Sequence, residues 1–283
     1  MNHTGTDHRE YLTTLFGLED RVAALTGGGG VLVGTMARAL GRVGVKVAVL
    51  DIALEAAERV ASEVREAGGE AIAVRCDVLD KSSVEAAAAA VVGAFGGVDI
   101  LINGAGGNKK EATTTPDLSF FDLPADAVTW VFNLNFIGTL LPSQVFGRLM
   151  AEQGRGAILN ISSMNAFQPL TRIPAYSAAK AAVSNFTQWL AVHMNQEYAP
   201  DIRVNALAPG FYLTEQNRFL LTDATTGDLT PRGQTIIDHT PMGRFGDPED
   251  LISTTLWLLS DGAAFVTGVV VPIDGGFSAF SGV

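Results

Sequence analysis

The sequence predicts an α/β fold: a single doubly wound, Rossmann-type domain with a seven-stranded parallel sheet and helices on both faces. Three observations support this prediction. Short apolar stretches alternate with Ala-rich helical stretches, the apolar stretches are nearly unbroken, and no linker or internal repeat divides the chain. Such alternation is typical of repeated βαβ units. Unbroken apolar strands are expected where helices cover both faces of a sheet.

The predicted elements follow in regular order along the chain. Strands are expected at residues 22–26, 46–50, 71–76, 100–103, 157–161, 204–208 and 269–273. Helices are expected at residues 34–41, 54–67, 82–95, 127–153, 175–198 and 248–259. We expect residues 1–17 to form a polar N-terminal extension and residues 18–283 to form one catalytic domain.

Two long stretches, 107–124 and 211–247, are expected to be irregular. Loops of this length inside a compact domain are usually functional. Both follow the carboxyl ends of predicted strands, where an open α/β sheet binds its ligands. The stretch 211–247 is long enough to act as a lid that excludes water from a substrate.

Composition and charge argue against several classes of protein. The net charge is −11 and the five lysines are scattered, so nucleic-acid binding is not expected. No apolar run reaches membrane-spanning length and the polar opening lacks a signal pattern, which favours a cytoplasmic protein without a membrane partner. The single Cys76 cannot form an internal disulfide, and the four histidines lack the spacing of metal ligands, so no metal is predicted.

A glycine-rich turn follows the first predicted strand and opens the first helix. Its backbone N–H groups and the helix dipole can face a pyrophosphate. The positions expected to contact a dinucleotide cofactor are Gly27, Gly28, Gly30 and Leu32. The spacing matches no standard glycine fingerprint, because Val31 and Val33 stand where T-G-x-x-x-G-x-G requires glycine. A merely flexible turn is the alternative interpretation.

Two carboxylates end the second and third predicted strands. Asp51 can accept hydrogen bonds from an adenosine ribose and would repel a 2′-phosphate, which favours NAD over NADP. Asp77, followed by Val78, can accept a hydrogen bond from the adenine amino group. For both aspartates, capping of the following helix is the alternative.

A tyrosine and a lysine in one helical stretch supply a candidate proton-transfer pair. The i, i+4 spacing places Tyr176 and Lys180 on one helix face. Ser163 ends the fifth predicted strand, at the same edge of the sheet as the glycine-rich turn. We expect the ammonium to lower the pKa of the phenol, and Ser163 to hold a substrate carbonyl while Tyr176 protonates it. The alternative is simple packing on the helix surface.

In combination, these residues resemble the short-chain dehydrogenase/reductase family from Leu18 to the end of the chain. The motifs are the glycine-rich turn, Asp51, Asn103-Gly104-Ala105-Gly106, Asn135, Ser163, Tyr176 with Lys180, and Pro209-Gly210. The resemblance implies that Asn103, Ala105 and Gly106 back the cofactor and that Asn135 holds a water in the proton relay. It also implies that Pro209 lies at the cofactor, that Thr214 meets the nicotinamide carboxamide, and that the protein is a homotetramer.

Within the family, the chain resembles the short-chain type of D-mannonate oxidoreductase. That likeness rests on Asn-Gly-Ala-Gly-Gly-Asn, on Pro-Gly-Phe-Tyr-Leu-Thr-Glu-Gln-Asn-Arg and on the tail Asp-Gly-Gly-Phe-Ser-Ala-Phe-Ser-Gly-Val. It implies a sugar-acid substrate, D-mannonate or D-fructuronate, as the small-molecule partner. Other interpretations are an oxidoreductase for another ketone, such as a ketogluconate, polyol, steroid or acyl-carrier substrate, and a non-catalytic NAD sensor.

The predicted loops offer partners for a polyhydroxy carboxylate, which needs a cation and several amide or hydroxyl groups. We expect Lys109 or Arg172 to bind the carboxylate, and Asn165 and Gln216 to bind hydroxyls. Gln168 belongs to the same candidate set. For each of them singly, a solvated loop side chain is the alternative.

Overall fold

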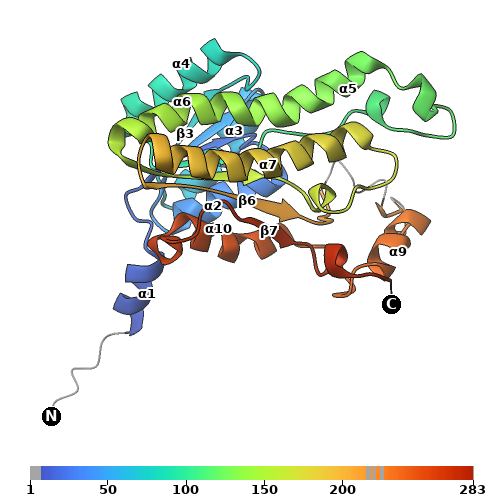
Figure 1. The fold of residues 1–283 in the computed structure, drawn as a ribbon. Helices are drawn as coiled ribbons and strands as arrows, with labels where there is room; N and C mark the ends of the chain where they lie inside the picture. The colour runs from blue at the N-terminus through green and yellow to red at the C-terminus, as the bar shows by residue number, and fades with distance from the viewer. Residues whose placement is uncertain (1–7, 215–217, 219–220, 224–225, 283) are drawn as a thin grey trace.

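The structure is a computed structural model that describes residues 8–214, 218, 221–223 and 226–282. One seven-stranded sheet, with all neighbouring strands parallel, forms its centre in the order β3-β2-β1-β4-β5-β6-β7 (Figure 1). The strands are β1 (Val22–Thr26), β2 (Lys46–Asp51), β3 (Ala71–Arg75), β4 (Ile100–Asn103), β5 (Arg155–Ile161), β6 (Asp201–Pro209) and β7 (Val270–Ile273). The predicted doubly wound fold is therefore confirmed.

Helices cover both faces of the sheet. The first face is covered by α2 (Val31–Arg42), α3 (Leu54–Glu66) and α10 (Ile252–Leu259), and the second by α4 (Lys81–Phe95), α6 (Gly138–Gln153) and α7 (Pro174–Glu197). Successive residues of β1 serve opposite faces: Ala23 and Leu25 belong to the first core, Val22 and Ala24 to the second. The strand order reverses between β1 and β4, which creates the switch point where such sheets bind ligands.

The stretch predicted as one helix at 127–153 is helical, but a π-helical turn that was not predicted interrupts it. Helix α5 (Ala125–Phe132) leads into the π turn Asn133–Ile137, and α6 follows directly. A π turn inserts an extra residue into the helix without a glycine or proline to mark it, so the apolar pattern runs straight through. Such turns often lie at functional sites, and this one contains buried Asn135.

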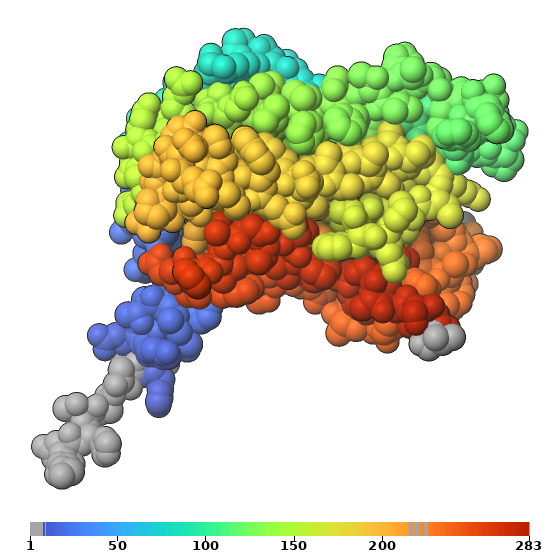
Figure 2. All heavy atoms as spheres, viewed as in Figure 1, coloured from blue at the N-terminus to red at the C-terminus, as the bar shows by residue number. Residues whose placement is uncertain are grey.

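Two helices occur where the sequence predicted none. Helix α1 (His8–Phe16) lies within the predicted polar extension and projects from the body of the molecule (Figures 1 and 2). Helix α9 (Pro231–Asp238) lies within the stretch expected to be irregular. Its start is capped by Thr230, whose hydroxyl accepts a hydrogen bond from the Gly233 N–H at 3.1 Å. Both helices are short, with nine residues in α1 and eight in α9, so each offers little more than two turns of pattern.

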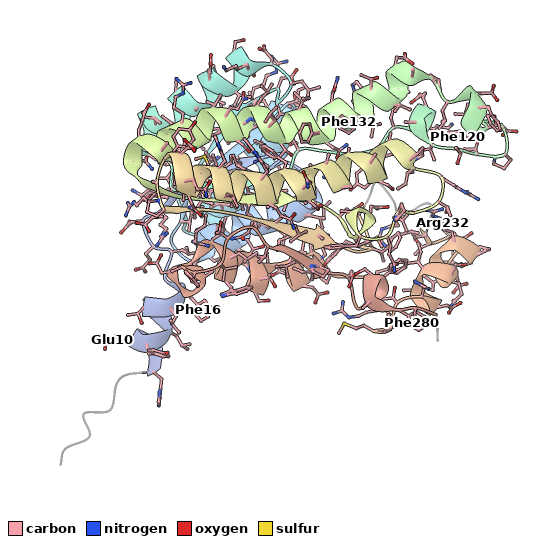
Figure 3. All side chains as sticks on the ribbon, viewed as in Figure 1. Glu10, Phe16, Phe120, Phe132, Arg232 and Phe280 are labelled. Atoms are coloured by element: carbon pink, nitrogen blue, oxygen red, sulfur yellow. The ribbon has the colours of Figure 1, made fainter. Side chains whose placement is uncertain are left out.

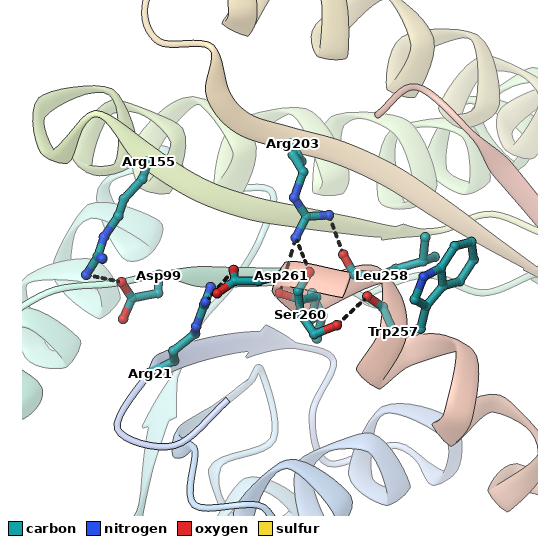
Figure 4. A network of polar contacts seen from close by, with 9 residues as sticks. Arg21, Asp99, Arg155, Arg203, Trp257, Leu258, Ser260 and Asp261 are labelled. Atoms are coloured by element: carbon teal, nitrogen blue, oxygen red, sulfur yellow. Dashed lines mark hydrogen bonds and ion pairs between the residues drawn. The ribbon is translucent and has the colours of Figure 1, made fainter. Parts of the chain in front are cut away.

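A buried arginine ties the end of α10 to β6 (Figure 4). The Arg203 guanidinium donates to the carbonyl oxygens of Leu258 at 2.5 Å, Leu259 at 3.2 Å and Ser260 at 3.1 Å. These are carbonyls of the last helical turn and beyond, which have no intrahelical donors. Arg203 therefore supplies donors to a buried helix end, where the Ser260 carbonyl also accepts the Ala263 N–H at 3.1 Å.

The loops expected to be functional gather at one end of the molecule. Phe120, in the stretch after β4, lies at the same end as Arg232 of α9 and Phe280 of the C-terminal tail (Figure 3). Short 3₁₀ turns, Lys110–Ala112 and Phe120–Asp122, shape the first of these loops. Across the described ranges, no helix is long and apolar enough to span a bilayer, and no His, Cys, Asp and Glu cluster has the arrangement of a metal site.

Candidate active site

The glycine-rich turn joins the end of β1 to the start of α2. Gly27 has a φ of +64°, and a Cβ there would lie 2.8 Å from the Cα of Ala105. Both the backbone conformation and the loop after β4 therefore require glycine at this position. A Cβ on Gly30 would meet only the carbonyl oxygen of Gly27, at 3.2 Å, so the turn is open on that side.

The first turn of α2 provides free backbone donors beside this opening. The N–H groups of Val31 and Leu32 belong to the first helical turn, where no intrahelical acceptor exists. With the positive end of the helix dipole, they fit the pyrophosphate of a dinucleotide. The N–H of Gly28 is already bonded to the Leu50 carbonyl at 3.0 Å. Gly28 therefore has no free N–H group to donate to a pyrophosphate. Its contribution is the lack of a side chain, which lets the backbone of the turn lie close to a ligand.

Asp51 lies next to the glycine-rich turn at the end of β2. Its Oδ2 accepts a hydrogen bond from the Gly29 N–H at 3.0 Å, and its Oδ1 accepts one from the Ala53 N–H at 2.9 Å. The carboxylate thus steadies both the turn and the approach to α3. Its remaining lone pairs can accept further hydrogen bonds, as the predicted contact with an adenosine ribose requires.

Asp77 and Val78 follow β3. The Asp77 carboxylate accepts the Leu79 N–H at 2.9 Å, whereas the cap of α4 is Asp80, which accepts the Ser82 N–H at 2.9 Å. The capping alternative for Asp77 is therefore wrong. Val78 is buried, and a Cβ on Gly138 would lie 2.9 Å from its Cγ2, so Val78 packs against the start of α6.

Ser163, Tyr176 and Lys180 come together at the carboxyl end of β5. Tyr176 and Lys180 lie on one face of α7, with the Lys180 Nζ 5.5 Å from the centre of the tyrosine ring. The ammonium donates to the carbonyl oxygen of Ile161 at 2.7 Å. The Ser163 hydroxyl lies near the Tyr176 hydroxyl and acts to lower the pKa of the phenol. The arrangement can pass a proton from Tyr176 to an oxygen held by Ser163.

The electrostatics of this cluster differ from the expectation. Burial raises the pKa of Tyr176 above its ordinary value, and the hydrogen bond from Ser163 lowers it by less. Burial also lowers the pKa of Lys180 to about 8. The predicted lowering of the phenol pKa is thus not seen. A neutral phenol at physiological pH is suited to donate a proton, and Lys180 can exchange one near neutrality.

Asn135, in the π turn, lies beside Lys180. Its Nδ2 donates to the carbonyl oxygens of Gly107 at 2.7 Å and Val131 at 2.8 Å, and its Oδ1 accepts the Gly107 N–H at 3.2 Å. A Cβ on Gly106 would lie 2.6 Å from this Oδ1 and 3.3 Å from the Lys180 Nζ. The missing side chain at Gly106 therefore leaves room for both groups, and the Asn135 amide fixes the turn after β4.

The side chain of Asn103 points into a buried polar network. Its Nδ2 donates to the Ser143 Oγ and to the Asn160 Oδ1, both at 2.9 Å. Its Oδ1 is the one buried side-chain oxygen or nitrogen without a partner among the described residues. Only the backbone after it, at Gly104 and Ala105, lies against the glycine-rich turn.

The two candidate amides after β5 are engaged inside the protein. Asn165 bonds to Ser163 and to two further groups described below. Gln168 donates through Nε2 to the carbonyl oxygen of Ser278 at 3.0 Å, which ties this loop to the C-terminal tail.

The two candidate cations come from different loops, Lys109 from the loop after β4 and Arg172 from the loop before α7. Lys109 places its Nζ 5.2 Å from the centre of the Trp130 ring. Arg172 lines a cleft of about 540 Å³, together with Phe120, Asn165 and Ser177; neither Ser163 nor Tyr176 lines it. Arg172 has a φ of +76°, uncommon for a residue with a side chain.

The remaining candidates follow β6. Pro209 is the last residue of that strand and is buried, and Thr214 is half-buried beyond it. Gln216 lies outside the described residues. Tyr212 and Gly246 pair as an isolated parallel bridge, and the Gly246 N–H donates to the Phe211 carbonyl at 2.8 Å. The two ends of the stretch 211–247 are therefore joined at its base.

Sequence reasoning missed two groups that shape the site. The Thr26 Oγ1 accepts hydrogen bonds from the N–H groups of Gly104 at 3.2 Å and Ala105 at 3.4 Å, which binds the two ligand-facing turns together. The position of this threonine at the end of the first strand could have predicted a contact with a neighbouring turn. The Ile161 carbonyl that holds Lys180 is a backbone atom, and its residue type gives no such signal.

Comparison with known proteins supports this description of the site. A model of the family described as enoyl-(acyl carrier protein) reductase matches residues 33–278. The uncharacterized oxidoreductase UxuB of Bacillus subtilis (strain 168) is 49% identical over 275 residues, which cover 94% of this chain and 98% of that protein. The 7alpha-hydroxysteroid dehydrogenase of Escherichia coli (strain K12) is 32% identical over 260 residues, covering 92% and 94%.

Solved structures show the same similarity. A protein of Haemophilus influenza named "putative D-Mannonate oxidoreductase", solved with bound NAD, is 47% identical and superposes with a TM-score of 0.89 over 96% of this chain and 100% of that chain. Together with the matched family model and the dehydrogenase relatives, this assigns a nicotinamide-dependent oxidoreductase that acts on CH–OH groups. The chain belongs to the short-chain dehydrogenase/reductase family.

Proposed function

We propose that the protein interconverts a secondary alcohol and a ketone on a sugar acid, D-mannonate and D-fructuronate, with NAD as its cofactor. The observation that carries the reaction class is the grouping of Ser163, Tyr176 and Lys180 at the carboxyl end of β5, with the buried Lys180 Nζ 5.5 Å from the centre of the tyrosine ring. A binding protein has no need of such a proton relay.

The residues of the chain divide the proton transfer between them. A bound nicotinamide supplies or accepts the hydride. Ser163 holds the carbonyl oxygen by donating a hydrogen bond to it, and the raised pKa of Tyr176 keeps a proton ready for that oxygen. Lys180, held by the Ile161 carbonyl, returns a proton to Tyr176. Alcohol oxidation runs through the same groups in reverse.

The choice of NAD rests on Asp51. A carboxylate bonded to the Gly29 N–H stands where a 2′-phosphate would have to lie, and like charges repel there. Arg59 is the cation beside this turn that would have to bind a 2′-phosphate. Its guanidinium, however, donates to the Gly29 carbonyl oxygen at 3.1 Å. The NAD bound to the Haemophilus protein agrees with this assignment.

The sugar-acid substrate is supported by the name of that Haemophilus protein and by the polar candidates around the site. Arg172 is one candidate for the carboxylate, because it lines a cleft beside Asn165 and Ser177 and no carboxylate among the described residues pairs with it. Lys109 is the second candidate, with its ammonium on the Trp130 ring. Gln168 and Gln216 remain candidates for hydroxyl groups.

The stretch 211–247 acts as a lid in this proposal. Its two ends are paired at Tyr212 and Gly246. Leu221 and Ile236 of this stretch pack with Met164, next to Ser163, and with Phe277 of the tail. Closure there excludes water from the hydride transfer.

Self-association into a homotetramer is part of the same proposal. A groove of about 1140 Å³ lies between α4, α6 and α7. Trp189 and Tyr198 line it, and their side chains are 55% and 59% exposed. Large aromatic side chains that are exposed together on one surface commonly meet a second subunit. Light scattering of the purified protein tests the expected mass of four chains.

A second substrate class has one observation in its favour. Phe120 and Phe121 are 68% and 91% exposed in the loop after β4 and could meet a long apolar ketone. The 7alpha-hydroxysteroid dehydrogenase relative acts on such a molecule by its name. The substrate test therefore includes a 7-oxo bile acid.

The deciding experiment measures NADH oxidation with fructuronate, tagaturonate, 5-ketogluconate, a non-acidic ketose and a 7-oxo bile acid. We expect turnover of an acidic sugar, and a KM at least about tenfold higher in Arg172→Ala. Lys46→Ala, at the opposite edge of the sheet, is the matched control and should leave KM unchanged. Turnover of only the non-acidic ketose or the bile acid would overturn the sugar-acid proposal.

A further inference from the structure

Asn165 holds the hydroxyl of Ser163 from two directions. The Ser163 Oγ accepts a hydrogen bond from the backbone N–H of Asn165 and another from its side-chain Nδ2, both at 3.2 Å. Both residues are buried, with 6% of their surface exposed. Water therefore does not compete freely for these bonds.

The orientation of the Asn165 amide is fixed by its own partners. Its Oδ1 accepts hydrogen bonds from the Leu170 N–H and from the Ser177 Oγ, each at 3.1 Å. An amide turned by 180° would place its NH₂ group against the Leu170 donor, which would leave that donor unsatisfied. The nitrogen must therefore face Ser163.

This arrangement determines where the Ser163 proton goes. A hydroxyl has two acceptor lone pairs and one O–H donor. Asn165 occupies both acceptor positions, so the O–H is left to point away from it, toward Tyr176 and the substrate oxygen. Donation into the hydroxyl also strengthens the hydrogen bond that the hydroxyl itself donates.

We propose that Asn165 is a positioning residue, which orients the Ser163 hydroxyl as a donor to the substrate oxygen instead of contacting the substrate itself. The proposal rests on the proposed role of Ser163 in catalysis, but not on the identity of the substrate. It gives Asn165 a role different from the hydroxyl-binding role that its sequence position suggested.

Asn165→Asp tests the proposal with little change in shape. The variant keeps an oxygen for Leu170 and Ser177 but replaces the donor to Ser163 with an acceptor, which draws the Ser163 proton away from the substrate. We expect kcat at pH 8 to fall about 10- to 100-fold, with the KM for NADH unchanged within about twofold. The assay uses the best substrate of the panel above.

The pH profile separates positioning from a structural role. Below its pKa, which burial should raise, the carboxyl introduced by Asn165→Asp carries a proton and can donate to Ser163 again. The ratio of variant to wild-type kcat should therefore rise as the pH falls from about 8 to about 5.5, the range over which a buried carboxyl takes up its proton. A structural defect predicts a ratio that does not change with pH.

Three further variants complete the test. Ser163→Ala should lose at least about 100-fold in kcat; if it does not, the proposed catalytic role of Ser163 fails and this proposal with it. Asn195→Asp is the matched control, because its Nδ2 donates to the Ala199, Pro200 and Ile202 carbonyls at the far end of α7. It should lower the melting temperature without lowering kcat. If Asn165→Asp does not fold, Asn165→Leu removes the donor without adding charge, and should lower kcat about tenfold.

Two results would overturn the role of Asn165 while leaving that of Ser163 intact. One is an inactive Ser163→Ala beside an Asn165→Asp or Asn165→Leu variant that retains wild-type kcat. The other is an Asn165→Asp deficit that is the same at every pH.

Discussion

Val33 fills the space into which a side chain at Gly104 would project. A Cβ on Gly104 would lie 2.2 Å from the Cγ2 of Val33 and 3.0 Å from the Thr26 carbonyl oxygen. At position 33 the sequence departs from the T-G-x-x-x-G-x-G pattern, with valine in place of glycine. The structure shows that Val33 and Gly104 are complementary, since the larger residue on α2 occupies the volume that glycine leaves after β4.

This packing predicts an energetic coupling between the two positions. Gly104→Ala should destabilise the protein by about 1–3 kcal/mol, because the new methyl group overlaps buried Val33. Val33→Ala removes the overlapping atom, so the double variant should be more stable than the two separate losses imply, by at least about 1 kcal/mol. Urea denaturation of the four proteins measures this coupling.

The control for this cycle is Gly93→Ala in α4. A Cβ on Gly93 meets nothing within 4 Å, so alanine should raise helix stability by about 0.5–1 kcal/mol. Strictly additive losses at positions 33 and 104 would contradict the complementary packing.

A second prediction concerns cofactor choice. Asp51→Ala removes the carboxylate that accepts the Gly29 N–H, together with its repulsion of a 2′-phosphate. We expect the ratio of kcat/KM for NADH to that for NADPH to fall at least about tenfold, and Asp51→Ala with Ile52→Arg to prefer NADPH. Asp77→Asn should weaken both cofactors without changing the ratio. An unchanged ratio in Asp51→Ala would assign that carboxylate to the turn alone.

The strands could be predicted because burial on both faces of a parallel sheet demands unbroken apolar runs. The predicted centres of the strands are right. However, β5 begins at Arg155, two residues before the predicted start at 157, and β6 begins at Asp201, three residues before the predicted start at 204. Polar residues can begin a strand there because the amino-terminal edge is exposed. Hydrogen bonding between neighbouring strands therefore extends β5 and β6 beyond the apolar runs from which they were predicted.

Some features of the site can likewise be predicted from residue types, whereas others depend on contacts that form only in the folded protein. The chemistry of Ser163, Tyr176 and Lys180 can be inferred from their residue types, and the position of α7 at the carboxyl end of β5 brings them together. The contacts of Asn165 depend on the path of the loop that returns Leu170 to it. The same limit applies to Val33 and Gly104, which lie 71 positions apart and meet only in the folded protein.

A third prediction concerns the buried helix end held by Arg203. Arg203→Met leaves the carbonyls of Leu258, Leu259 and Ser260 without this donor and removes a cation from the negative end of α10. We expect a loss of about 2–4 kcal/mol in the free energy of unfolding. The matched control is Arg155→Met, whose pair with Asp99 is at the surface and should contribute less than about 0.5 kcal/mol. Equal denaturation midpoints for the two variants would contradict the capping role.

The last prediction is that Lys180 lowers stability in order to serve catalysis. Burial lowers its pKa from 10.5 to about 8, so keeping it charged at pH 7 costs up to about 3 kcal/mol, partly offset by the bond to the Ile161 carbonyl. Lys180→Met should therefore be inactive, yet about 1–2 kcal/mol more stable than the wild type at pH 7.

The pH dependence of that difference has a definite sign. Between about pH 8 and 10.5 the folded protein has lost the Lys180 proton while the unfolded chain still binds one, so wild-type stability from this group rises with pH. Below pH 8 both states are protonated and the cost of burial is fully present. The stability advantage of Lys180→Met should thus be largest below pH 8 and shrink toward pH 10. Denaturation curves for both proteins at pH 7, 8, 9 and 10 measure it, and an advantage that grows with pH would show that the buried ammonium is not the destabilising group.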